Sequence, residues 1–295
     1  MRLRSEVSVV LLSVALLSGC ISRTERLVPS QVLLKADTIA KSALLEKLRK
    51  DSLAVNTLVV SKSTLKASRM VSNEAIKNYH DVNGVIAVDR PGHLRLEIEK
   101  VFTLAQMVSD EKQYRVSVPP EGKFGVGDVA APVRGAEFPY NLRPSHILDA
   151  LFVDGEQFIG KPDIDSYLLV ETESQPDGMH SYSVIFFGKT GAGGVPLEEL
   201  WFDRTLGVQE VVRKKSYLPD GEIESDIRYS NFQMFGNIAF PMKIVIKRPI
   251  ENYALEMNIE KLDLNKAVDP AMFTLERPNG VDEVDLNTGK DIKSK

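Results

Sequence analysis

Apolar side chains recur at every second position through much of this chain, and this period limits the possible folds more than any other feature. Seven runs alternate in this way between Val82 and Ile259. Their apolar positions include Val82, Ile86, Val88; Leu94, Leu96, Ile98; Tyr114, Val116, Val118; Tyr182, Val184, Phe186; Ile223, Ile227, Tyr229; Met242, Ile244, Ile246; and Tyr253, Leu255, Met257, Ile259. Strands with one apolar and one polar face are typical of antiparallel sheets, because strands of parallel sheets are buried on both faces.

Turn residues separate these runs and predict a meander of hairpins with about eleven strands. The turns include residues 89–92, 175–178 and 218–221, each containing Pro and Gly. The Gly-rich segment 188–194 lies between two strands with no helix behind it, so it predicts a hairpin and not a phosphate-binding loop. A sheet of this size curls, and its concave apolar face needs a cover.

Two segments show helical spacing of apolar residues, which makes the predicted fold class α+β. The first spans residues 31–51, with Ser30 as N-cap and apolar residues from Val32 to Leu48 on one face. The second spans residues 143–153 and has Pro144 in its first turn. The connection before it, Glu121 to Leu142, is rich in Gly and Pro and is expected to be irregular. The polar tail, residues 277–295, is expected to fray.

The N-terminus has the layout of a secretory signal. Arg2 and Arg4 precede an apolar stretch, residues 7–17, that is too short to span a bilayer. Cys20 is the only cysteine and follows Ser18 and Gly19, so the segment resembles the lipobox of bacterial lipoproteins. This reading predicts a signal peptide over residues 1–19, an acylated Cys20 and a tether over residues 20–29. The alternative is an ordinary signal peptide with an incidental cysteine. Residue 21 is Ile and not Asp, which favours the outer membrane.

The sequence offers no recognisable catalytic or metal site. The four histidines are scattered, and there is no nucleophile elbow or phosphate loop. The acidic pairs Asp163/Asp165 and Glu198/Glu199 are typical of solvated strand edges, and His146 of a helix surface or cap. The chain has 37 basic and 41 acidic residues, and its net charge of -4 does not indicate the excess of positive charge that nucleic-acid binding requires. We therefore expect no enzyme activity, cofactor, metal or nucleic-acid partner.

Two helices leave part of the concave face uncovered, which favours an apolar cavity suited to acyl chains. The alternative is a packed core filled by Trp201, Phe202, Phe186 and Tyr253. Strand alternation gives the expected cavity residues, which are Leu94, Leu96, Ile98, Phe186, Trp201, Ile244, Ile246, Leu255 and Met257. The lid helix contributes Ile147, Leu148, Leu151 and Phe152.

Several segments resemble the superfamily of the lipoprotein carrier LolA and its outer-membrane acceptor LolB. They are the amphipathic helix, residues 82–86 followed by Pro91 and 94–96, and the C-terminal segments 229–232, 240–244, 264–265 and 269–273. The resemblance covers most of residues 30–276 and implies an unclosed antiparallel half-barrel with a lid of helices over a cavity for lipid chains. The chain is longer than the acceptor, because it adds the 121–142 connection and the tail.

These observations predict an outer-membrane lipoprotein that faces the periplasm and binds acyl chains of lipids or lipoproteins. A periplasmic carrier or another envelope protein is the expected protein partner. The alternative is a lipoprotein with a packed core that serves only as an envelope interaction or structural module. A periplasmic hydrolase would need a convergent acid or nucleophile in a cleft, and the sequence indicates none.

Overall fold

The computed structural model describes residues 39–72, 75–131, 141–170, 181–190, 193–203, 210–288 and 290–292. The chain divides into two compact units, Met1–Leu34 and Lys35–Lys295, and all described residues belong to the second. The predicted signal peptide, Cys20, the tether and the Ser30 cap therefore lie outside the described residues, as does His180.

The described residues form two α-helices, two short 3-10 helices and fifteen strands. In chain order these are α2 (Lys41–Ala54), β1 (Thr57–Ser72), β2 (Ala75–Asp89), β3 (His93–Glu99), β4 (Thr103–Ser109), β5 (Gln113–Val118), η1 (Pro119–Glu121), β6 (Lys123–Asp128), α3 (Pro144–Leu151), β7 (Ile164–Val170), β8 (Ser181–Thr190), β9 (Gly193–Asp203), β10 (Val211–Tyr217), β11 (Ile223–Phe235), β12 (Ile238–Arg248), β13 (Tyr253–Leu264), η2 (Pro270–Phe273), β14 (Asp282–Asp285) and β15 (Lys290–Ile292).

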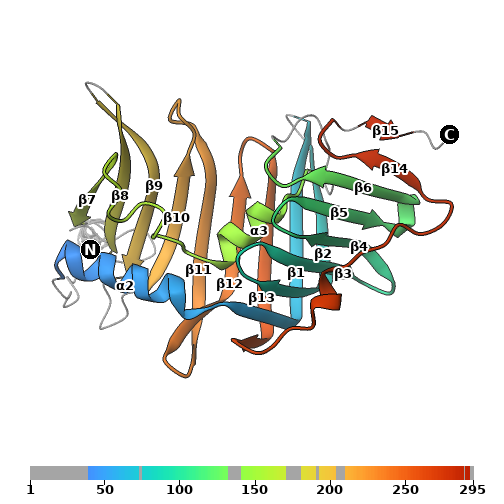
Figure 1. Ribbon diagram of the computed structural model, residues 1–295, viewed down its shortest axis with the longest axis horizontal. Coiled ribbons are helices and arrows are strands. Elements are labelled where there is room, and N and C mark those ends of the chain that lie inside the picture. The colour runs from blue at the N-terminus through green and yellow to red at the C-terminus, as the bar shows by residue number, and fades with distance from the viewer. Residues whose placement is uncertain are drawn as a thin grey trace, which may run out of the picture. The chain divides into compact units, whose positions relative to one another are not determined.

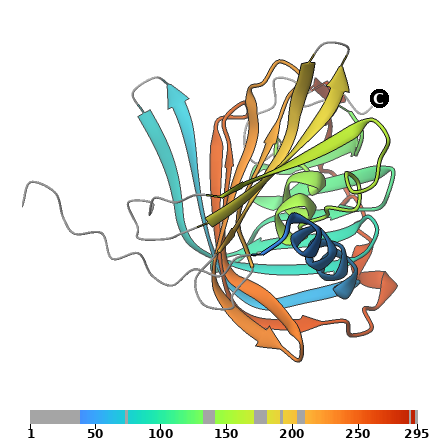
Figure 2. The ribbon, with the colours of Figure 1, turned by 90° about the vertical axis from the view of Figure 1, so that its left-hand side faces the viewer.

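All fifteen strands form one sheet, in the order β15-β14-β6-β5-β4-β3-β2-β1-β13-β12-β11-β10-β9-β8-β7 (Figure 1). Most neighbours are consecutive antiparallel hairpins, and the long β1–β13 pair joins the two halves. Among the described residues β7 and β15 end the sheet without closing it, and Figure 2 shows the sheet curving around both helices. The predicted α+β fold, with an unclosed curved antiparallel sheet, is confirmed. The predicted strand number was too low, and β14 pairs in parallel with β6.

Strand β6 lies within the segment that was predicted to be irregular. Two of its residues are glycines because side chains of neighbouring segments occupy their space. A Cβ on Gly125 would lie 2.6 Å from Leu286 Cδ2, and one on Gly127 would lie 2.7 Å from Tyr114 Cε1. Glycine at these positions permits close approach but removes the apolar alternation from the sequence. Residues 132–140 of the same segment lie outside the described residues.

The tail also joins the sheet, where fraying was expected. Strand β14 pairs with β6, and Val284 and Leu286 are buried in the core. Arg277 supports the approach to β14, since its guanidinium donates to the Val281 carbonyl oxygen at 2.6 Å and pairs with Glu283. The prediction of fraying was based on the polar composition of the tail, and it overlooked the apolar residues Val284 and Leu286 at alternate positions.

Helix α3 lies within the predicted range 143–153 and begins with Pro144 at its first position, as expected. Helix α2 differs from the prediction, because it begins at Lys41 and residues 39 and 40 are not helical. The Ile39 backbone N–H donates instead to the Tyr182 hydroxyl at 3.2 Å, which holds the chain against β8. Residues 31–38 lie outside the described residues.

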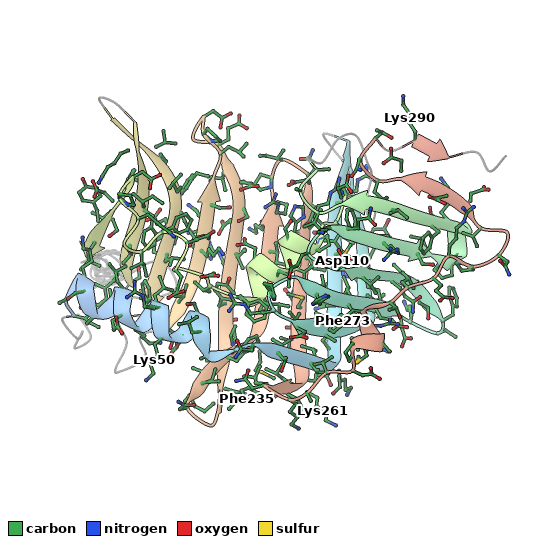
Figure 3. All side chains as sticks on the ribbon, in the orientation of Figure 1. Lys50, Asp110, Phe235, Lys261, Phe273 and Lys290 are labelled. Atoms are coloured by element: carbon green, nitrogen blue, oxygen red, sulfur yellow. The ribbon has the colours of Figure 1, made fainter. Side chains whose placement is uncertain are left out.

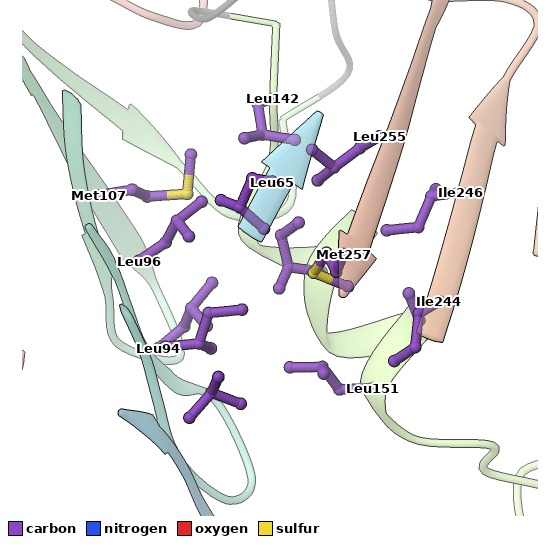
Figure 4. Close-up of a cluster of buried hydrophobic side chains, with 14 of the residues drawn as sticks. Leu65, Leu94, Leu96, Met107, Leu142, Leu151, Ile244, Ile246, Leu255 and Met257 are labelled. Carbon is purple, nitrogen blue, oxygen red and sulfur yellow. The ribbon is translucent and has the colours of Figure 1, made fainter. Parts of the chain in front are cut away.

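Two apolar clusters fill the concave side. The larger cluster joins strands of both halves beneath α3, and in Figure 4 Leu94, Leu96 and Met107 face Ile244, Ile246, Leu255 and Met257, with Leu151 of α3 nearby. The smaller cluster packs Leu44 and Leu48 of α2 against Tyr182, Val184, Phe186, Leu200 and Phe202 of β8 and β9. Each helix therefore covers a different part of the sheet, and the boundary between the clusters is where a gap can form.

Candidate functional site

A pocket opens between the two helices and the β11–β12 hairpin. Its walls come from the end of α2, the end of α3, the start of β10 and the hairpin. The residues that line it are Leu48, Lys50, Asp51, Ser52, Ala54, Val55, Leu151, Phe152, Val153, Glu210, Val211, Tyr229, Phe232, Asn237, Ile238, Ala239, Phe240 and Pro241. It encloses about 830 Å³, including the solvent at its mouth. In Figure 3 Lys50 and Phe235 lie along the lower edge, where α2 and this hairpin end.

The pocket is apolar inside and polar at its mouth. Leu151, Tyr229 and Phe240 are buried members of the larger cluster, so the inner wall continues the core. Lys50, Asp51 and Asn237 are exposed. This arrangement matches small-molecule sites, which bury an apolar ligand body and place a few polar groups at the opening.

Arg90 ties the ends of the two helices together beside this pocket. Its guanidinium donates to the Ser52 carbonyl of α2 at 2.5 Å and pairs with Asp154, just after α3, at 2.9 Å. The same group lies over the Phe152 ring, 5.0 Å from its centroid. The pocket walls contributed by α2 and α3 are therefore fixed relative to each other by one side chain.

A buried polar cluster lies under the middle of α3 and consists of Lys214, Asp149, Glu198 and Tyr229. The Lys214 ammonium of β10 is fully buried; it contacts Asp149 Oδ1 at 2.5 Å and the Asp149 carbonyl at 3.1 Å. Glu198 Oε2 lies 3.5 Å from it, whereas Glu198 Oε1 and the Tyr229 hydroxyl have no hydrogen-bond partner in the part of the chain that the structure describes. Lys214 thus connects α3 to the sheet.

Burial controls the protonation of this cluster. Desolvation raises the pKa of Glu198 from 4.5 to about 7, although the Lys214 charge opposes the rise. Burial also lowers the pKa of Lys214, but the Glu198 and Asp149 carboxylates outweigh it and hold that pKa above its usual value. Burial raises the pKa of Tyr229 as well. Lys214 stays charged at every physiological pH, and Glu198 titrates near neutrality.

A second polar group caps α3 at its start. The Arg143 backbone N–H donates to His146 Nδ1 at 3.4 Å, and the same nitrogen lies 2.7 Å from the Tyr253 hydroxyl. Burial, with the charges of Arg248 and Arg143, lowers the pKa of His146 to about 2. The capping role expected of His146 is confirmed, but the residue is buried and not on the helix surface. It stays neutral and structural.

The predicted cavity residues do not line this pocket. Leu94, Leu96, Ile244, Ile246, Leu255 and Met257 are buried in the larger cluster, and Ile98 packs against it. Leu96 and Ile98 also border a smaller hollow of about 230 Å³, open solvent included, near Leu142. Phe186 lies in the smaller cluster. Of the lid residues, Leu151 and Phe152 line the pocket, Ile147 is fully buried, and Leu148 packs on the core.

Trp201 faces away from the concave side, contrary to the prediction. Its ring lies under the Arg213 guanidinium at 5.0 Å and the Lys215 ammonium at 5.1 Å, whereas its neighbours Leu200 and Phe202 are buried. Successive side chains of a strand point to opposite faces, so Trp201 and Phe202 cannot share one. Because Trp201 and Phe202 are adjacent and both aromatic, the sequence did not show which of them points inward, and Trp201 was wrongly assigned to the concave face.

Glu198 and Lys214 are two of the buried charged residues that sequence reasoning missed; Arg143 and Arg248 are also buried. Glu198 was placed on a solvated edge, but it is only 2 % exposed. The signal was present, because Glu198 is in phase with Leu200 and Phe202, and Lys214 is in phase with Val212. The other acidic pair, Asp163 and Asp165, is exposed as expected.

A cluster of metal-binding side chains and a membrane-spanning helix are both absent from the described ranges. No group of three or more His, Cys, Asp or Glu side chains there could hold a metal ion. His80 is exposed and His93 packs against the Phe273 ring, with centroids 5.5 Å apart. No helix in those ranges is long and apolar enough to cross a membrane.

Comparison with known proteins gives matches at the level of structure. No protein-family model and no curated protein matches the sequence. A DUF1329 family protein from Desulfovibrio piger has a TM-score of 0.52 at 14% identity, over 79% of this chain and 95% of that protein. A LolA superfamily protein from Nitrosomonas europaea gives 0.48 at 14% identity, over 81% and 99%. A domain from Vibrio parahaemolyticus, described as an outer membrane lipoprotein-sorting protein domain, gives 0.47 at 9% identity, over 78% and 94%.

The likeness to the Desulfovibrio protein shows a shared fold. A LolA superfamily protein and a lipoprotein-sorting protein domain are among the similar structures.

Proposed function

We propose that this protein binds acyl chains of lipids or lipoproteins in the pocket between α2, α3 and the β11–β12 hairpin. The pocket itself carries the proposal, because it is an opening in a concave side that is largely filled by side chains. Its inner wall is apolar and continuous with the core, and its exposed polar residues stand at the mouth.

An acyl chain fits these properties. Each buried methylene group contributes about 0.8 kcal/mol, so the affinity should rise with each carbon that enters the pocket. The polar mouth leaves the head group in water. Binding and release would transfer a lipid without chemical change.

The N-terminal sequence supports a place on a membrane. Acylation of Cys20, with removal of residues 1–19, would leave the domain tethered to a bilayer. Ile21 favours the outer membrane, facing the periplasm. There the protein would receive acyl chains from a periplasmic carrier or exchange them with another envelope protein.

Native mass spectrometry of residues 21–295, expressed in a bacterial host, tests the proposal. Bound lipid that is lost on solvent extraction is the expected result. Ile238→Asp places a carboxylate on the pocket wall and should weaken uptake of a fluorescent fatty acid at least about tenfold, since a buried charge is costly next to an acyl chain.

The matched control is Ile250→Asp, because Ile250 is exposed after the other end of β12 and does not line the pocket. It should bind like the unsubstituted protein. Equal uptake by a folded Ile238→Asp variant would remove the pocket from consideration.

One observation favours the alternative of a non-catalytic interaction module. Six of the predicted cavity residues are at most 3 % exposed in the packed cluster, so most of the concave side has no room for a ligand. A mass free of lipid, together with no uptake of fatty acid, would support that function.

A further inference from the structure

The outer face of strands β7, β8 and β9 carries an exposed apolar patch. Tyr167 and Leu169 of β7 are 57% and 51% exposed, and Ile185 and Phe187 of β8 lie beside them. Cross-strand pairing places Tyr167 opposite Ile185, and the Tyr167 and Phe187 rings meet edge to face at 5.6 Å. These side chains border a hollow of about 1020 Å³, open solvent included, with Lys189 and Asp165 at its side.

The patch is not needed for the core. The opposite face of the same strands is already occupied by Val184 and Phe186, which pack under α2 in the smaller cluster. A strand of an antiparallel sheet normally keeps one face polar, and here both faces are apolar. Apolar side chains gathered on an exposed surface indicate that something covers them.

Trp201 and two cations extend this patch toward β10. Trp201 is paired with Ser183 of β8, and its ring lies under Arg213 and Lys215. Arg213 also pairs with Asp226 at 2.7 Å. Glu199 lies nearby, where it accepts hydrogen bonds from Ser183 and from Tyr217. Aromatic rings with lysine and arginine among them are typical of surfaces at the lipid–water boundary.

The N-terminal chain enters the domain at these strands. The Ile39 N–H bonds to Tyr182 of β8, and Lys41 donates to the Ser166 carbonyl of β7 at 2.7 Å. Cys20 precedes Ile39 by nineteen residues, which span at most about 65 Å when extended. The described part of the chain therefore begins beside the edge strand that carries the patch.

We infer that the outer face of β7–β9 is the surface on which the anchored domain rests against the lipid bilayer. The inference rests on the proposed acylation of Cys20. The tether makes the contact intramolecular, so a few apolar side chains are enough to orient a domain that is already held at the membrane. Tyr167, Leu169 and Phe187 would enter the head-group region, while Lys215 and Lys189, which pairs with Asp165 at 3.2 Å, would reach the phosphates. The pocket, on the concave side, would stay free of the membrane.

The single tryptophan provides a direct test, because Trp201 lies on the face in question. The full acylated chain is reconstituted in vesicles of phosphatidylethanolamine and phosphatidylglycerol with brominated or unmodified acyl chains. Brominated lipid should quench about half of the Trp201 emission, since interfacial groups reach the acyl boundary. Leu169→Glu should abolish most of this quenching.

The matched control is Leu53→Glu, a leucine of α2 that is 58% exposed and lies outside the patch. This variant should be quenched like the unsubstituted protein. Ile238→Asp should also be quenched normally, which separates bilayer contact from lipid held in the pocket. Flotation of the vesicles reports the anchor independently, and Leu169→Glu should float and take up fatty acid unchanged.

Several results would overturn the inference. If the protein floats but Trp201 is not quenched, the anchor stands and the orientation is wrong. If quenching survives Leu169→Glu, another surface meets the bilayer. If Leu169→Glu changes only the oligomeric mass, a second copy covers the patch. If the chain does not float, both the proposed acyl anchor and the proposed orientation are wrong. The acyl-binding pocket is tested separately by native mass spectrometry and fatty-acid uptake.

Discussion

Glu198 makes the stability of this protein depend on pH in a predictable direction. Its carboxyl is 2 % exposed, one of its oxygens has no hydrogen-bond partner among the described residues, and burial raises its pKa from 4.5 to about 7. Below pH 4.5 the group is protonated in the folded and unfolded chains. Between pH 4.5 and 7 only the unfolded chain ionises, so the free energy of unfolding falls as pH rises. The pKa difference corresponds to about 3 kcal/mol.

Glu198→Gln removes this titration and keeps the shape of the side chain. The free energy of unfolding of the variant, minus that of the unsubstituted protein, should rise by about 3 kcal/mol between pH 4.5 and 7.5. Urea unfolding at a series of pH values, followed by circular dichroism, measures this difference. His146 of the unfolded chain titrates in the same range and contributes with the opposite sign, but this residue is present in both proteins and its contribution cancels.

Glu199→Gln is the matched substitution, because Glu199 follows Glu198 and points to the other face of β9. Only the variant at position 198 should show the rising difference. A flat difference for Glu198→Gln would refute the reasoning, because it would mean that Lys214 fully compensates the burial of the Glu198 charge.

Three further predictions concern the contacts around α3. His146→Gln should lower the pH midpoint of acid unfolding. Burial holds the pKa of His146 near 2, so below pH 6.5 only the unfolded chain gains a proton at this residue. The free energy of unfolding of the unsubstituted protein therefore falls by up to about 1.4 kcal/mol for each unit that the pH falls. Lys214→Met should destabilise the fold by about 3–5 kcal/mol in urea at pH 8, because it leaves Asp149 and Glu198 without their cation; a loss below 1 kcal/mol would contradict this. Gly155→Ala should lower the free energy of unfolding by about 1–3 kcal/mol, since its Cβ would lie 2.1 Å from Leu48 Cδ2. The loss should be smaller in a Leu48→Ala background. Additive losses would show that the clash is relieved elsewhere.

Alternation in the sequence predicted the sheet because most strands keep one phase along their length. Leu94, Ile244 and Met257 all lie on the predicted face. Strands with register shifts were harder to read. In β1 the pairing with β2 shifts after Val60 and again after Leu65, which breaks the period that the prediction depends on. Strand β1 was therefore absent from the predicted runs, although it is the longest strand.

The position of the pocket could not be predicted from strand alternation. Alternation identifies the concave face, but it cannot say which part of that face a helix fills. Helix α3 packs Ile147, Ala150 and Leu151 into the larger cluster beneath it. The space that remains lies beside α3, where Val211 and Ile238 meet the end of α2. The position of this space depends on the path of the chain between helices and strands, and no periodic pattern in the sequence encodes that path.

Helix α3 is tied to the sheet at three points, and this bears on how the pocket can be filled. His146 contacts Tyr253 of β13, Asp149 contacts Lys214 of β10, and Asp154, just beyond the helix, contacts Arg90 at the end of β2. Lifting α3 would break all three and leave the fully buried Lys214 without a counterion on the helix, which is costly. The pocket opens past the end of α2 and the β11–β12 hairpin, so an acyl chain can enter from that side while α3 stays in place. Substitutions in the hairpin wall should therefore change acyl-chain uptake, and substitutions in the three ties should mainly change stability.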